Sequence, residues 1–151
     1  MLNWCEGTLK VRGTKENIKR FVLEGLHPVD LFGDAKSELT VNEFGDINSN
    51  ETCWIEETRR GFVEGVEVYL SEYEDDERLT AVFDSKFAWG INADELLRTC
   101  KKYHVDMKIH AFEQGMEFNQ VIEIIDGEVI HDYEIHFTDY QWECVCPKLG
   151  G

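Results

Sequence analysis

Basic residues are scarce in this sequence. Fifteen Lys and Arg stand against thirty-one Asp and Glu in 151 residues, which leaves a formal net charge of −16. Affinity for nucleic acid depends mainly on neutralising phosphates, and anionic membranes attract basic segments in the same way. We therefore expect no direct nucleic-acid or membrane partner. A protein with a basic surface would suit this charge best.

The chain also has no apolar run near the ~18 residues that a membrane helix needs. Residues 1–6 lack the basic and then apolar build of a signal peptide. The five cysteines are an odd number, and their spacing suggests no disulfide framework. These features together predict a cytoplasmic protein with free thiols.

Motifs of known catalytic and metal sites are missing as well. The sequence contains no Gly-rich phosphate loop, nucleophile elbow or HExxH pattern. Cys144 and Cys146 form a CxC pattern, which differs from the CxxC of a zinc knuckle. We therefore expect no catalytic residues, no metal site and no cofactor, and an enzyme is the least favoured class of function.

The best-defined local pattern is a β-hairpin near the end of the chain. Strand-like runs at 116–125 and 128–137 are joined by Asp126-Gly127, a pair suited to a type I′ turn. A two-residue turn predicts these facing pairs: Ile124 with Val129, Ile122 with His131, and Phe118 with Ile135. The opposite face of the hairpin would then carry four acidic residues: Glu117, Glu123, Asp132 and Glu134.

Two helices have recognisable starts. Thr14 and Asn92 are suited to N-cap positions, and Glu95 could complete a capping box with Asn92. Trp89, just before the second helix, is expected to pack that helix against the sheet. Residues 46–50 have the composition of a turn.

The order of these elements predicts an α+β fold. We expect one domain over residues 1–151, with a ferredoxin-like βαββαβ antiparallel sheet and two helices on one face. The segment at about 27–60 would be an insertion, and one extra strand would follow at the C-terminal end.

Several of these landmarks resemble a known family, the YubB-type ferredoxin-like proteins. The similar residues are Asn3-Trp4-Cys5 before a strand and Gly13, Phe87-Ala88-Trp89-Gly90 before a helix, Lys101-Lys102-Tyr103, and Glu113 to Phe118. The resemblance covers residues 1–25 and about 84–133, and it departs at Gly90, where a proline is expected after the tryptophan. It implies a ferredoxin-like fold and a gene carried by phages, plasmids or integrated elements, and it brings no catalytic residues.

The acidic residues are unevenly distributed. Residues 37–58 hold six acids and no base, 61–77 hold seven acids and no base, and 110–147 hold nine acids and no base. The densest run would form an acidic tip: Glu72, Glu74, Asp75, Asp76 and Glu77. Together with the acidic hairpin face, this tip predicts an array of carboxylates that imitates phosphates.

The family context directs this pattern to one function. Small acidic proteins of mobile elements often resemble anti-restriction or anti-CRISPR inhibitors, which imitate DNA. The leading hypothesis is a non-enzymatic DNA mimic that inhibits a basic, nucleic-acid-handling host protein. The alternative is an accessory protein–protein interaction module of unknown function that uses an apolar sheet surface for self-association or for a partner peptide. An ordinary solvated acidic surface is also compatible with the sequence, and the partner's identity and the oligomeric state stay open.

Overall fold

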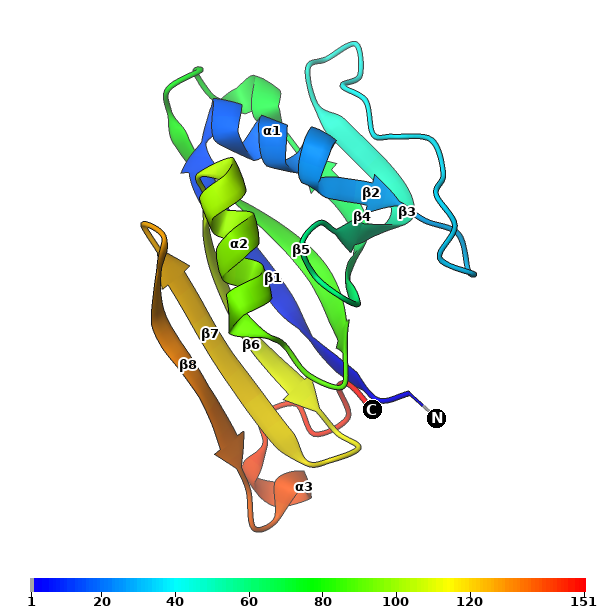
Figure 1. Ribbon diagram of the computed structural model, residues 1–151, viewed down its shortest axis with the longest axis vertical. Coiled ribbons are helices and arrows are strands. Elements are labelled where there is room, and N and C mark those ends of the chain that lie inside the picture. Colours follow the sequence, from blue (N-terminus) through cyan, green and yellow to red (C-terminus); the bar gives the residue numbers. More distant parts are fainter. Residues whose placement is uncertain (1) are drawn as a thin grey trace.

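A computed structural model describes residues 2–151, which form one eight-stranded sheet with short helices (Figure 1). All neighbouring strands are antiparallel, and their order is β2-β3-β4-β5-β1-β6-β7-β8. The strands are β1 (Trp4–Thr14), β2 (Leu26–Pro28), β3 (Ile47–Ile55), β4 (Gly61–Val68), β5 (Arg78–Ala88), β6 (Asp106–Glu113), β7 (Phe118–Ile125) and β8 (Glu128–His136). The helices are α1 (Lys15–Gly25), the 3-10 turn η1 (Leu70–Glu72), α2 (Ala93–Tyr103) and α3 (Tyr140–Glu143).

The helix starts are largely as predicted. The Thr14 hydroxyl accepts a hydrogen bond from the Asn17 N–H at 3.2 Å, and the Asn92 side chain accepts from the N–H groups of Asp94 and Glu95. The predicted capping box is wrong in one respect. The Glu95 carboxylate accepts instead from the backbone N–H of Arg59 at 3.0 Å, which ties α2 to the β3–β4 turn.

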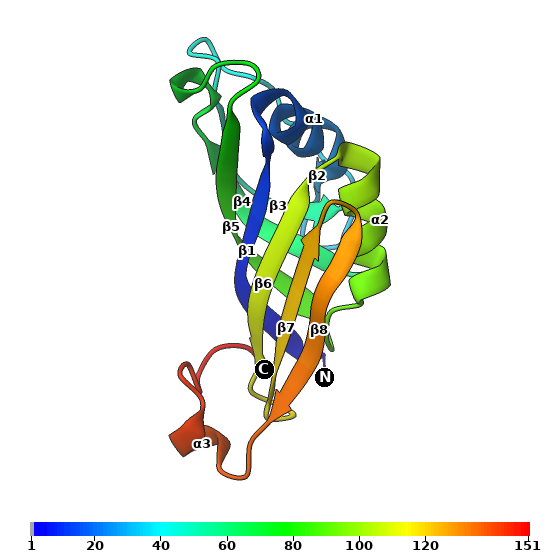
Figure 2. The same cartoon turned by 90° about the vertical axis from the view of Figure 1, so that its left-hand side faces the viewer.

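The core lies between the sheet and the helices α1 and α2, which cover the same face (Figure 2). The alternating pattern of β1 identifies the buried face of the sheet. Its odd-numbered residues from Cys5 to Gly13 are buried, whereas Thr8, Lys10 and Arg12 are exposed on the other face. Phe21 of α1 packs edge-to-face against Phe83 and Tyr103, with ring centroids 6.3 and 5.8 Å apart.

The α+β prediction is confirmed, but the sheet is larger than expected. The predicted insertion contributes β2 and β3 to one edge of the sheet, and two strands, not one, follow β6. The prediction of a turn at 46–50 is wrong, because β3 begins at Ile47 and its residues Ile47, Asn48 and Ser49 already pair with β4. Pairing with a neighbouring strand overrides the weak local preference of this polar stretch.

The predicted hairpin is present, with a different register. Asp126 and Gly127 have φ angles of 50° and 72°, as a type I′ turn requires. Ile124 faces Val129 as predicted, but a β-bulge then leaves Ile130 as an extra residue in β8. Beyond it the predicted pairs are wrong: Ile122 faces Asp132 and Phe118 faces His136.

The C-terminal tail covers one end of the sheet face that α1 and α2 leave free (Figure 2). Tyr140 and Cys144 are buried, and both donate toward the side-chain oxygen of Asn119 on β7, at 3.3 and 3.6 Å. The backbone of Gly151 exchanges two hydrogen bonds with Trp4, at 3.1 and 2.9 Å. The tail therefore links β7, near the C-terminal end of the chain, to the start of β1.

Candidate functional site

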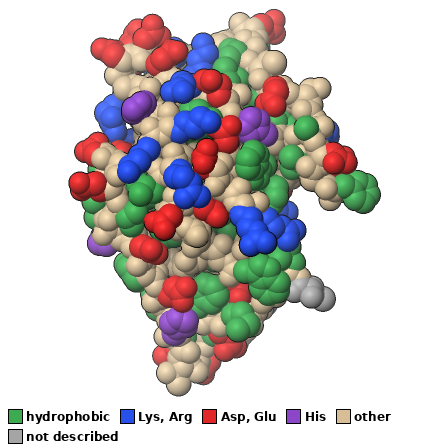
Figure 3. Space-filling model, viewed as in Figure 1, with side chains coloured by type: hydrophobic (Ala, Val, Ile, Leu, Met, Phe, Trp, Pro, Cys, Tyr) green, Lys and Arg blue, Asp and Glu red, His purple; other side chains and the backbone are tan. Residues whose placement is uncertain are grey.

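The predicted acidic tip is a continuous, exposed surface at one end of the molecule. It follows β4 and comprises η1 and the turn into β5, and all five of its predicted acidic residues are exposed. Figure 3 shows acidic side chains gathered at the end where η1 lies, whereas Lys and Arg gather over the helices. Glu67, the last acidic residue of β4, is also exposed and accepts a hydrogen bond from the Tyr69 hydroxyl.

The backbone of the tip is held firmly, and its carboxylates stay exposed to solvent, although that of Glu77 accepts a long hydrogen bond from the Glu74 N–H at 3.3 Å. The N–H of Lys15 donates to the Glu77 carbonyl at 2.9 Å, and the Lys15 ammonium donates to the Tyr73 carbonyl at 2.8 Å. The carboxylate of buried Asp46 accepts from the Ser71 N–H at 2.8 Å. Among residues 2–151, the one ion pair made by the five tip acids joins Lys15 to Asp75 at 3.8 Å, with the Asp75 side chain 94% exposed. Such a pair neutralises little of the charge.

The predicted acidic hairpin face does not exist as one surface. Residues that face each other in a ladder share one side of the sheet. Asp132 therefore shares the core-facing side with Ile122, while Glu123 faces His131 on the opposite side. Glu134 faces buried Gln120 and so joins Asp132. Glu117 lies outside both strands, in the turn between β6 and β7, with a φ angle of 60°.

The Glu123 carboxylate is less available to a partner than predicted, because basic side chains lie close to it. It lies 3.9 Å from the Lys108 ammonium and 3.9 Å from the His131 ring nitrogen, and its side chain is only 20% exposed. Asp132 and Glu134 are exposed, and Glu134 lies 3.0 Å from His136. The structure thus brings the tip residues together and separates the hairpin residues.

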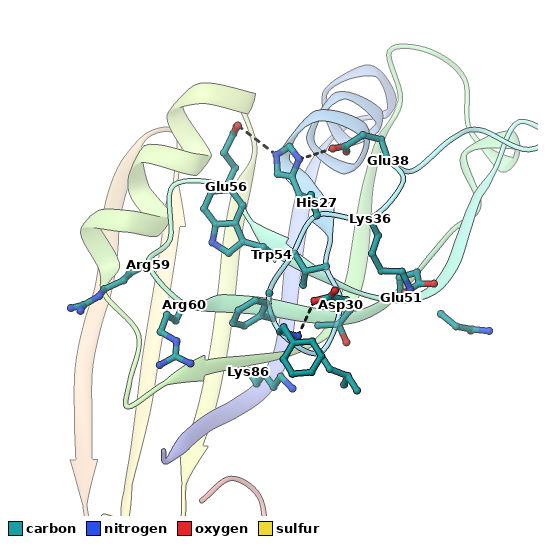
Figure 4. A pocket seen from close by; sticks show the side chains of 18 of the residues that line it. His27, Asp30, Lys36, Glu38, Glu51, Trp54, Glu56, Arg59, Arg60 and Lys86 are labelled. Carbon is teal, nitrogen blue, oxygen red and sulfur yellow. Dashed lines mark hydrogen bonds and ion pairs between the residues drawn. The ribbon is translucent and has the colours of Figure 1, made fainter. Parts of the chain in front are cut away.

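A second candidate site is a groove of about 1020 Å³ over the edge of the sheet at β2, β3 and β4 (Figure 4). Its wall on one side is the loop that follows β2. Its aromatic lining comes from β1, β3, β4 and the loop after β2: Trp4, Trp54, Phe62 and Phe32. Trp4 packs edge-to-face on Phe62 at 6.1 Å, and the Trp54 indole N–H donates to the Thr58 carbonyl at 2.9 Å. We call this site the arginine–aromatic groove, because Arg59 and Arg60 also line it.

His27 lies at the inner end of the groove between two carboxylates. Its ring nitrogens are 3.3 Å from Glu38 and 3.6 Å from Glu56, and Figure 4 shows it pointing toward both. The longer contact exceeds hydrogen-bond distance, which leaves the buried Nε2 without a hydrogen bond. His27 also stacks at a tilt on Trp54, with centroids 5.6 Å apart. This arrangement fixes the ring of Trp54 on one side.

Glu56 connects the groove to α2. Partial burial acts to raise its pKa, but hydrogen bonds from Lys102 and from the Tyr103 hydroxyl outweigh burial, so the pKa of Glu56 lies below its ordinary value. The Lys102 ammonium is 2.9 Å from the carboxylate. The same carboxylate raises the pKa of Tyr103, after the larger effect of burial. The Glu56 side chain is therefore a structural tie rather than a proton donor near neutral pH.

Trp89 does not have the role predicted for it. Its side chain is 56% exposed and its φ angle is 68°, a conformation that is unusual for a bulky residue. It lines a smaller hollow of about 360 Å³ together with Arg59, Arg60 and Glu95. The two arginines thus stand between a large hollow and a small one, each with an indole ring in its lining.

Within residues 2–151, no three His, Cys, Asp or Glu side chains are placed to hold a metal ion. Burial raises the pKa of Cys5 and Cys100 to about 12 and that of Cys53 to about 11, so these thiols stay protonated.

The sequence contains one indication of the groove. Arg59 and Arg60 are the only Lys or Arg between residues 37 and 77. Two adjacent bases in an otherwise acidic stretch are unusual enough to suggest a role.

Comparisons with known proteins found no matching family model, no matching curated protein and no matching solved structure. Over residues 2–151, every helix is too short or too polar to cross a bilayer.

Proposed function

We propose that this chain is a non-enzymatic binding protein of a mobile genetic element that inhibits a basic, nucleic-acid-handling host protein. In this hypothesis the acidic tip imitates the phosphates of DNA, as in inhibitors of the anti-CRISPR or anti-defence type, and it acts in the cytoplasm. The observation that carries the proposal is the tip itself: five exposed carboxylates on a backbone held by Lys15 and Asp46, with a single long ion pair.

A rigid array of free charge favours recognition. Because the backbone of the tip is already ordered, a partner does not have to immobilise it on binding. Complementary lysines and arginines on the partner would speed association and align the two surfaces. The hairpin residues contribute less to this proposal, since Glu123 is paired and Asp132 and Glu134 lie on the other side of the sheet from it.

The alternative, an interaction module with an apolar sheet surface, receives support from only one part of the sheet. The centre of the face that the helices leave free is polar around Lys10 and Arg12 on β1, and Val82 is the single exposed apolar residue of β5 there. The apolar part of this face is the arginine–aromatic groove, because Trp54 faces Phe62 and Phe62 faces Lys86, which lies on the same side of β5 as Val82.

We also infer that the centre of the sheet is a ferredoxin-like unit. Its four strands have the spatial order β4-β5-β1-β6. In the chain they occur with the two helices in the order β1, α1, β4, β5, α2, β6, with β2 and β3 inserted between α1 and β4, and both helices lie on one face. A crystal structure tests this assignment. It fails if a different set of strands superposes better on ferredoxin-like domains.

The functional proposal is tested by capture from host lysate on the immobilised chain at low and high salt. A partner bound through the tip should be lost as salt rises, because screening weakens exposed charge pairs. It should also be lost from a variant with the tip amidated: E72Q, E74Q, D75N, D76N and E77Q.

A matched control amidates five exposed acids scattered elsewhere: Asp34, Asp84, Asp94, Glu128 and Glu143. It changes the net charge equally and should keep the partner. If the amount of captured partner is unchanged at high salt and is the same for both variants, the tip is not the binding surface. A four-residue amide variant of Glu117, Glu123, Asp132 and Glu134 measures any contribution from the hairpin.

A further inference from the structure

The loop after β2 presents two apolar side chains to solvent. Leu31 is 101% exposed and Phe32 is 90% exposed. The loop is nevertheless ordered: the Asp30 carboxylate accepts from the N–H groups of Phe32 and Asp34, at 2.8 and 2.9 Å. Exposing two large apolar side chains on an ordered loop beside an aromatic groove marks an interaction surface.

The charges that line the groove are mostly satisfied within the chain. Lys36 lies 2.6 Å from Glu51, and Lys86 lies 2.6 Å from Glu64, just outside the groove. The remaining acidic residues of the lining are also engaged: Glu38 with His27, Glu56 with Lys102, and Asp30 with two backbone N–H groups. Arg59 and Arg60 differ, because within residues 2–151 neither guanidinium has an ion pair or a hydrogen bond.

The backbone under these two arginines is fixed at both residues. The Arg59 N–H donates to the Glu95 carboxylate, and the Arg60 carbonyl accepts from the Ala88 N–H at 3.0 Å. Both side chains are exposed at the rim that separates the groove from the hollow beside Trp89. The structure therefore anchors the backbone that carries two unpaired cations, beside aromatic side chains, on a strongly acidic protein.

We propose that the arginine–aromatic groove binds a peptide segment of a partner protein that carries an apolar side chain next to one or more carboxylates. The apolar side chain would enter the groove between Phe32 and Trp54, and the carboxylates would make paired hydrogen bonds with Arg59 and Arg60. Trp and Arg are the residues that contribute most often to binding energy at protein interfaces. This groove is separate from the acidic tip. The groove would bind an acidic segment of a partner, whereas the tip would bind a basic surface.

A peptide fits these observations better than single-stranded nucleic acid. Nucleic-acid sites of that kind stack bases on free aromatic faces. Here the Lys86 ammonium lies 4.8 Å above the Trp4 ring, and His27 stacks on Trp54. The net charge of −16 further opposes a long polyanion, whereas a segment with one or two carboxylates meets only the local positive charge.

The experiment pans a random library of short displayed peptides against the full chain and measures affinities of the selected sequences as synthetic peptides. We expect Asp or Glu beside Phe, Leu or Trp to be enriched. The double variant R59E/R60E should weaken binding of these peptides by about tenfold or more, as loss of a central Arg contact does. F32S should also weaken it, and it tests the apolar half of the site without changing charge.

The matched control is K10E/K148E, which makes the same charge change at two exposed lysines without ion pairs in residues 2–151. It should leave the affinity within about twofold, given the screening of distant charges. Circular dichroism of each variant shows whether it is folded. The proposal is overturned if no peptide is enriched, if the enriched peptides lack acidic residues, or if R59E/R60E binds them as K10E/K148E does. Binding of a labelled oligothymidine that R59E/R60E abolishes would overturn it in favour of a nucleic-acid site.

Discussion

Gln120 is the buried polar residue whose replacement should reveal most about the fold. It lies on β7 and is only 5% exposed. Its side-chain oxygen accepts from the Ile91 N–H at 2.8 Å, and its side-chain N–H donates to the Ile91 carbonyl at 2.9 Å. One amide side chain thus satisfies both backbone polar groups of Ile91, in the segment that joins Trp89 to α2.

The change Gln120→Leu keeps the approximate size of the side chain and removes both hydrogen bonds. An unsatisfied buried backbone group costs about 1–3 kcal/mol, and two such groups are left in this variant. Removing the buried polar amide of Gln120 itself offsets part of that cost. We expect a net loss of about 2–4 kcal/mol in the free energy of unfolding, which lowers Tm by about 5–15 °C in a domain of this size.

Urea unfolding followed by circular dichroism measures this loss. Gln141→Leu, the same chemical change at an exposed position, is the control and should change stability by less than about 0.5 kcal/mol. Hydrogen exchange at the Ile91 amide should accelerate more than exchange at central core strands, because the local tie is lost. A loss below about 1 kcal/mol for Gln120→Leu would show that Ile91 finds other partners and that the inferred tie is wrong.

Three further predictions concern other parts of the fold. Gly7→Ala places a Cβ 2.5 Å from the His110 carbonyl oxygen, so it should destabilise the chain by about 1–3 kcal/mol in urea unfolding, whereas Thr8→Ala next to it should be nearly neutral. Because the pKa of Glu56 is lowered below 4.5 in the folded state, its carboxylate stabilises fully above that pH and loses this effect as the pH falls further. The stability difference between the parent chain and Glu56→Gln should therefore shrink between neutral and strongly acidic pH, and a constant difference would contradict the assignment. Cys146 is the one exposed cysteine of five, so mass spectrometry after iodoacetamide should find it modified in the folded chain and all five modified in urea. Rapid native labelling of Cys5 would refute the burial described for it.

The acidic tip could be predicted because it is continuous in sequence. Its five acids follow one another within six residues, so any turn exposes them together. The acidic hairpin face could not, since it depended on a register carried over many pairs. One extra residue, Ile130, moves Asp132 and Glu134 to the side opposite Glu123.

The groove depends on contacts that no local pattern contains. Trp4, Trp54 and Lys86 come from three strands, and Lys86 lies over Trp4 only because β1 and β5 pair in one particular register. The Glu95 side chain, predicted to cap its own helix, binds Arg59 across 36 positions of sequence. Arg59 and Arg60 stay unpaired because nearby carboxylates contact other basic residues instead.

Sequence alone determined the α+β class, the helix starts at Thr14 and Asn92, and the turn at Asp126-Gly127, because each depends on atoms within a few residues. The tertiary structure decided how many strands the sheet has, which carboxylates share a face, and which arginines stay unpaired. Those properties are set by strand register and by competition among distant partners. In the β7–β8 hairpin, a single bulged residue is enough to change which carboxylates share a face.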